Sequence, residues 1–112
     1  MKTGVFIGRF QPLHDGHKKC IKRVLQENDH CCVFIRDTAK SEKNPFSFED
    51  REKMIRQAFP DTSQVSCHRL PDPSADLTVY IGREVGYELI KLDATTEAIS
   101  ATSIRKQLYQ QP

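Results

Sequence analysis

Apolar and polar stretches alternate along this 112-residue chain in a way that predicts strands and helices in turn. Five short apolar runs have the length and the β-branched or aromatic content of strands: residues 4–7, 31–35, 65–70, 77–81 and 87–92. Two longer stretches have apolar positions at helical spacing. The predicted apolar stripes are Cys20, Ile21, Val24 and Leu25 in the first helix, and Met54, Ile55, Ala58 and Phe59 in a second helix that Ser47 caps and Pro60 stops.

This order of elements predicts an α/β fold. Strands that alternate with helices form a parallel sheet with right-handed crossovers, so we expect a single Rossmann-like domain with a parallel five-stranded sheet flanked by helices. No linker, repeat or low-complexity tract interrupts the chain, and residues 1–112 are expected to form one domain.

Residues 8–17, Gly-Arg-Phe-Gln-Pro-Leu-His-Asp-Gly-His, join the first strand to the first helix, where α/β sheets place their ligands. Gly8 allows a sharp exit from the strand, and Gly16 removes a side chain where a ligand must approach the backbone. His14 and His17 lie three residues apart beside the free N–H groups of the helix N-terminus, a corner that attracts phosphate. The alternative is that both imidazoles face solvent or only cap the helix.

A second anion-binding corner is predicted near the end of the chain. Ser100, Thr102 and Ser103 place hydroxyl groups at the start of a last helix, and Arg105 follows within its first turn. An ordinary Ser/Thr cap with an exposed arginine is the alternative. Together with the histidine corner, however, this second helix N-terminus could hold the opposite side of one triphosphate.

Three more positions have both a structural and a functional interpretation. Lys43 lies in a polar loop and is either solvated or folded over a phosphate. Arg51 lies in the first turn of the second helix, where its charge opposes the helix dipole, so either a ligand or a surface salt bridge compensates it. Gly82 follows a predicted strand, where a nucleotide base or ribose could approach the backbone or the chain could simply turn.

Composition narrows the possible partners. Lys and Arg total 17 against 15 acidic residues, and this net charge of +2 is too mild to indicate nucleic-acid binding. No apolar run approaches membrane-spanning length and no signal peptide is evident, so we expect a cytoplasmic protein without a membrane partner. The four cysteines lack CxxC spacing, which predicts free thiols and no metal site. A core this small favours a homo-oligomer.

Three segments resemble signatures of the HxGH nucleotidyltransferase superfamily. Residues 14–17 (HDGH) resemble the HxGH motif, and residues 99–105 (ISATSIR) resemble the ISxTxIR motif. Residues 43–51 (KNPFSFEDR) are similar to the segment that opens the second helix in the same proteins. The resemblance implies that an acceptor's phosphate oxygen attacks the α-phosphorus of a nucleoside triphosphate and expels pyrophosphate, with Mg²⁺ carried on the triphosphate.

The resemblance also implies roles for individual residues. It makes His14, His17 and Arg105 catalytic, and it places Lys43 and Arg51 at the acceptor's phosphate. The nucleotide contacts that it implies are Gly8, Arg9, Phe10, Gly16, Gly82, Ser100, Thr102 and Ser103.

Two sets of motifs indicate different substrates. Residues 8–12 (GRFQP) and 44–46 (NPF) look like nicotinamide-mononucleotide adenylyltransferases, which use ATP. Residues 96–102 (TEAISAT) are similar to the RTEGISTT signature of cytidylyltransferases that act on small alcohol phosphates, but Thr95 stands where the arginine belongs. ATP with nicotinamide mononucleotide is therefore favoured. The short connection before the last signature is a gap in the adenylyl case. The alternatives are a CTP-dependent enzyme and a nucleotide-binding module without turnover. The shortness of the chain and Ala101 motivate the module.

Overall fold

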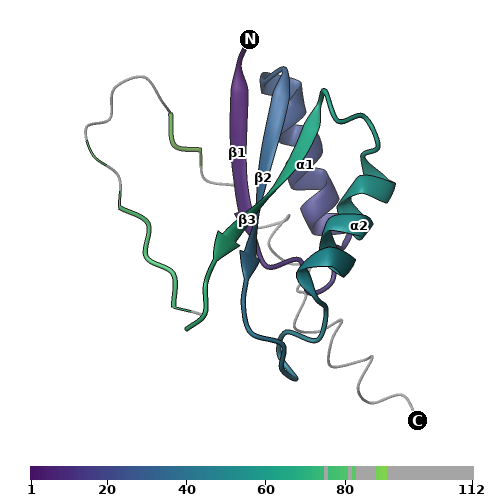
Figure 1. Cartoon of the computed structure of the whole chain (residues 1–112). Coiled ribbons are helices and arrows are strands. Elements are labelled where there is room, and N and C mark those ends of the chain that lie inside the picture. Colours follow the sequence, from purple (N-terminus) through teal and green to yellow (C-terminus); the bar gives the residue numbers. More distant parts are fainter. Residues whose placement is uncertain (75, 81, 83–87, 91–112) are drawn as a thin grey trace.

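A computed structural model describes residues 1–74, 76–80, 82 and 88–90 (Figure 1). Strands and helices alternate in the order β1 (Thr3–Gly8), α1 (Asp15–Glu27), β2 (His30–Asp37), α2 (Phe48–Ala58) and β3 (Val65–Pro71). The three strands form a parallel sheet in the order β1-β2-β3. The predicted parallel α/β architecture is therefore confirmed for this part of the chain.

The prediction of five strands is not met by the described residues, which contain three. Residues 77–80 and 88–90, expected in the fourth and fifth strands, have no regular secondary structure. Most of their apolar side chains are exposed, with Tyr80 91% and Leu89 62% accessible. A strand forms only where a neighbouring backbone pairs with it, and apolar spacing alone cannot supply that neighbour. The predicted last helix lies outside the described residues.

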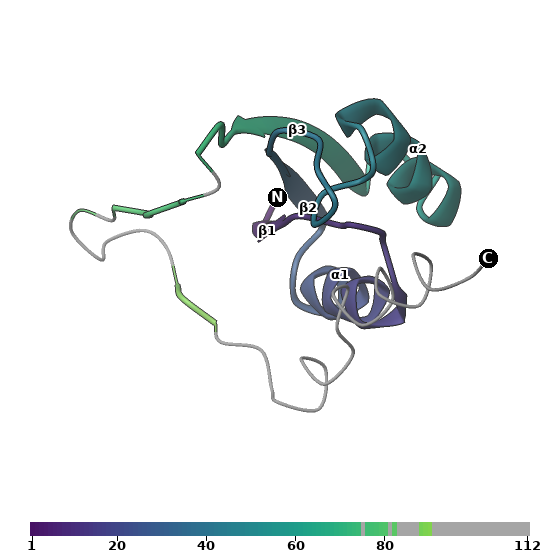
Figure 2. The ribbon, with the colours of Figure 1, turned by 90° about the horizontal axis from the view of Figure 1, so that it is seen from below.

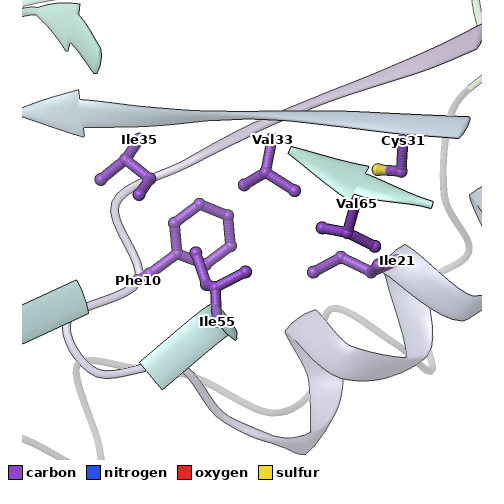
Figure 3. Close-up of a cluster of buried hydrophobic side chains, with 7 residues drawn as sticks. All are labelled: Phe10, Ile21, Cys31, Val33, Ile35, Ile55 and Val65. Carbon is purple, nitrogen blue, oxygen red and sulfur yellow. The ribbon is translucent and has the colours of Figure 1, made fainter. Parts of the chain in front are cut away.

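Both helices cover the same face of the sheet (Figure 2). The register sets which residues face them, because Gly4 pairs with Cys31 and Cys31 pairs with Val65. Cys31, Val33 and Ile35, at alternate positions of β2, point into this helix-covered face and are fully buried. Figure 3 shows the resulting core between the sheet and the helices, made of Phe10, Ile21, Cys31, Val33, Ile35, Ile55 and Val65.

Phe10 belongs to this core although it lies in a loop. Its backbone adopts φ 52°, a conformation that is uncommon outside glycine, and its ring is completely buried. The same ring explains why residue 8 is a glycine, because a Cβ at this position would lie only 3.0 Å from the ring's Cζ atom. The side chain of Phe10 therefore packs in the core, and its predicted contact with the nucleotide stays a prediction.

Candidate active site

His14 and His17 lie at the start of α1, where each side chain accepts a hydrogen bond from the backbone N–H of the other. His14 is the N-cap, and its Nδ1 accepts hydrogen bonds from the backbone N–H groups of Gly16, at 3.1 Å, and His17, at 3.3 Å. In return, the backbone N–H of His14 donates to Nδ1 of His17 at 3.3 Å. The two rings stack with their centroids 3.7 Å apart. This reciprocal capping box is built from imidazoles in place of the usual hydroxyl and carboxylate.

This geometry fixes where each ring carries its proton. Because both Nδ1 atoms accept backbone hydrogen bonds, a neutral imidazole at either position must hold its proton on Nε2. Among the described residues, none accepts a hydrogen bond from either Nε2. The corner therefore presents two N–H donors side by side, and the capping and anion-binding interpretations of these histidines are compatible.

Burial keeps both imidazoles neutral. It lowers the pKa of His14, an effect that the nearby Asp15 carboxylate partly opposes. Burial lowers the pKa of His17 further, to about 3, and the neighbouring His14 adds to the shift. The edge of the Phe10 ring packs against His17 with centroids 4.7 Å apart, which excludes water from one side of the imidazole. Near neutral pH the site thus offers uncharged donors.

We expect the free energy of unfolding to fall as the pH drops from about 6.5 towards 3. In this range the unfolded chain protonates His17 whereas the folded chain does not, so lower pH favours unfolding, by at most about 1.4 kcal/mol per pH unit. Urea unfolding at a series of pH values measures the slope. The variant H17Q keeps an acceptor for the cap and should have a shallower slope, whereas H68Q should match the wild type. Equal slopes for wild type and H17Q would contradict the assigned burial.

Gln11 connects the histidine loop to the loop that precedes α2. Its side chain is fully buried, and its Nε2 donates to the carbonyl of Phe46 at 3.0 Å. Its Oε1 accepts from the N–H of Phe46 at 2.9 Å. Sequence analysis misses this role because the partner lies 35 residues away, although a glutamine between Phe10 and Pro12 in an otherwise apolar turn is a weak signal.

Arg51 lies in the first turn of α2, as predicted, and its side chain points into the fold. Its side chain is fully buried, and its Nη1 donates to the carbonyls of Arg9, at 2.8 Å, and Arg36, at 2.6 Å. Its Nε donates to the carbonyl of Ser47 at 3.1 Å. Burial lowers the pKa of Arg51, and Asp37, whose Oδ1 lies 3.7 Å from Nη2, opposes this shift. The guanidinium thus fastens the loop after β1 to β2 and α2. Its predicted place at the acceptor's phosphate stays a prediction.

The structure describes only some of the remaining predicted site residues. Gly16 is buried in the first turn of α1, and Arg9 is half-buried in the loop after β1. Lys43 is exposed in the loop between β2 and α2. Gly82 is exposed, and nothing lies within 4 Å of a Cβ placed there. The four residues of the second anion corner lie outside the described residues: Ser100, Thr102, Ser103 and Arg105.

The described part of the chain contains no cluster of three or more His, Cys, Asp or Glu side chains that could hold a metal ion. All four cysteines are free thiols, and burial raises the pKa of Cys31 to about 12, which makes it a poor metal ligand. None of the described helices has the length and apolar character needed to cross a membrane.

The fold and this corner define a class of α/β proteins that bind ligands where a parallel strand meets its helix. Residues 5–78 match the family described as cytidylyltransferase-like. The nicotinamide-nucleotide adenylyltransferase of Pyrococcus furiosus is 38% identical over 140 aligned positions, which cover 98% of this chain and 74% of that protein. The corresponding protein of Thermococcus onnurineus is 30% identical over 137 positions, which cover 97% and 73%. The chain therefore belongs to the cytidylyltransferase-like family of nucleotidyltransferases.

A solved structure agrees with this assignment. The bifunctional NMN adenylyltransferase/ADP ribose pyrophosphatase of Francisella tularensis, crystallised with AMP and a manganese ion, superposes with a TM-score of 0.60 at 38% identity. The match covers 64% of this chain but only 23% of that bifunctional protein. The predicted membership of the nucleotidyltransferase superfamily is confirmed, and the names of the relatives favour the adenylyl alternative over the cytidylyl one.

Both sequence alignments also reveal a difference in length. They extend over 140 and 137 positions, whereas this chain has 112 residues, so these relatives have internal positions without a counterpart here.

Proposed function

We propose that this chain transfers the adenylyl group of ATP to nicotinamide mononucleotide, forming NAD and releasing pyrophosphate. The observation that carries the proposal is the pair of neutral imidazoles at the start of α1, each with Nε2–H free of any described acceptor. Relatives that are named nicotinamide-nucleotide adenylyltransferases support the choice of nucleotide and acceptor.

In the proposed reaction, a phosphate oxygen of the acceptor forms a bond to the α-phosphorus while the bond from that phosphorus to the β-phosphate oxygen breaks. Two anions that repel each other must be aligned, and the leaving pyrophosphate gains negative charge. Fixed N–H donors stabilise such charge without rearranging during the reaction. His14 and His17 have this property because their rings are held by the capping box and by Phe10.

The other contacts in this proposal are cationic or hydroxyl groups. Lys43, exposed on the loop before α2, would screen the acceptor's phosphate. Ser100, Thr102, Ser103 and Arg105 would hold the triphosphate from its other side. Mg²⁺ would arrive bound to the triphosphate, since the described residues offer no carboxylate cage for it. Gly16 leaves room for a phosphate beside the helix N-terminus.

An assay of pyrophosphate release over a panel of triphosphates and phosphate acceptors tests the proposal. We expect release with ATP and nicotinamide mononucleotide together, accompanied by NAD, and little with either substrate alone. Pyrophosphate release that requires CTP and an alcohol phosphate would overturn the choice of substrates. It would still agree with nucleotidyl transfer as the class of reaction.

A nucleotide-binding module without turnover is the second candidate. The shortness of the chain relative to its alignments favours it, because the absent positions could include residues that an active enzyme needs. Binding of ATP by calorimetry, with no product from any acceptor in the panel, would support the module and contradict the enzyme.

A further inference from the structure

The free edge of β1 lacks the features that protect edge strands. Among the described residues, β1 pairs only with β2, so no described strand lies beside its other edge. Residues 3–8 contain no charged residue and no proline, and Val5 is 59% and Ile7 39% exposed. Natural edge strands usually carry charges, proline or a covering element because a bare edge recruits another strand. We therefore expect another strand to pair with this edge.

Residues 77–80 have the properties of that partner. The stretch Leu-Thr-Val-Tyr is rich in strand-forming residues, and two of its apolar side chains are exposed, with Val79 56% and Tyr80 91% accessible. The match to the family ends at residue 78, so it includes the first two residues of this stretch. A strand that continues this parallel sheet beside β1 would bury these side chains and pair the open backbone.

The connection from β3 is too short for this pairing within one chain. Only residues 72–76 separate Pro71 from the candidate strand. Asp72 is itself held in place, because Nε and Nη2 of Arg36 both lie 2.7 Å from its buried carboxylate oxygen. A parallel strand would have to start at the opposite end of the sheet, about 20 Å along β1 and about 14 Å across the strands. Such crossovers need about a dozen residues or more, and four free residues reach at most about 14 Å.

We propose that residues 77–80 of one copy pair in parallel with β1 of a second copy, and that the exchange is reciprocal. The length limit disappears when the receiving strand belongs to another molecule, and short hinge loops are known to favour such exchange. Two identical exchanges close the assembly as a two-fold dimer. This inference does not rest on the proposed function.

Exchange would also complete the candidate site from two chains. In a parallel pair, the carboxyl end of the incoming strand lies at the same edge of the sheet as Gly8 and the histidine corner. Gly82 of the partner subunit would then follow its strand beside that corner.

The dimer is tested by light scattering after size exclusion over a wide range of concentrations. We expect the wild type to have twice the 12.9 kDa mass of one chain. A flexible insert of about a dozen Gly and Ser residues after Ser74 should permit closure within one chain and produce a monomer. The same insert after Ala39, in another exposed loop, should leave the dimer intact.

A matched pair of proline variants locates the interface. V79P removes a backbone donor from the exchanged strand and should give monomers, whereas L89P, at an exposed position outside that strand, should remain dimeric. Circular dichroism confirms that the part formed by β1 to β3 stays folded. A monomeric wild type, or a dimer that both V79P and the Ser74 insert leave unchanged, would overturn the proposal.

Discussion

Replacing His17 with alanine is expected to lower turnover roughly 10²–10³-fold, the usual effect of removing one preorganised donor to a developing negative charge. The Nε2–H of His17 is held in place by its Nδ1 contact to the cap and by the Phe10 ring, so alanine removes one fixed donor of the pair. Steady-state kinetics with ATP and nicotinamide mononucleotide measure the loss, which should lie in kcat more than in KM.

The variant H68A is the matched control for this experiment. His68 lies on β3, where its ring stacks on Phe34 at 5.1 Å, and it takes no part in the capping box. Its turnover should stay within a few-fold of the wild type. If H17A is folded by circular dichroism and its turnover falls less than tenfold, His17 does not have the assigned role.

Replacing Arg51 with methionine is expected to destabilise the fold by about 3–5 kcal/mol, the cost of removing one side of a buried charged network. Methionine keeps much of the volume but removes the donor that joins the carbonyls of Arg9 and Arg36. It also removes one of the two cations near Asp37, the other being Arg69 at 3.4 Å. Urea unfolding measures the change. This loss is a large fraction of the stability of a chain this size.

Arg56, on the same helix, supplies the comparison. It is 43% exposed and only approaches Glu52, at 3.8 Å, so R56M should change the free energy of unfolding by less than about 1 kcal/mol. If R51M proves as stable as R56M, Arg51 is not the structural fastener described above, and a ligand-binding role would again have to be considered.

The local parts of the structure could be predicted from the sequence. The stripe of α1 puts Ile21 and Cys20 in the core as expected, and Ser47 caps α2 by accepting from the N–H of Asp50. The histidine corner was also predictable, because two histidines three residues apart at a helix start depend only on local geometry. Such features need no knowledge of which distant segments meet.

Features that depend on distant contacts could not be predicted. Arg51 has the sequence position of an exposed residue in a first helical turn, but the carbonyls of Arg9 and Arg36 converge on it from other elements. The bonds between Gln11 and Phe46 and the burial of Phe10 arise in the same way. Residues 77–80 show the reverse case, since a strand-like pattern has no neighbour to pair with in the described part of the chain.

The proposed role of the histidine corner requires neutral His14 and His17 rings, with both protons on Nε2 and directed at phosphate. Nitrogen-15 NMR of the imidazoles, recorded near neutral pH with and without Mg·ATP, tests this directly. We predict the Nε2–H tautomer for both rings in the free protein and shifts of both Nε2 signals when the nucleotide binds. Imidazolium or Nδ1–H forms, or Nε2 signals that stay unchanged while ATP binds, would contradict the account.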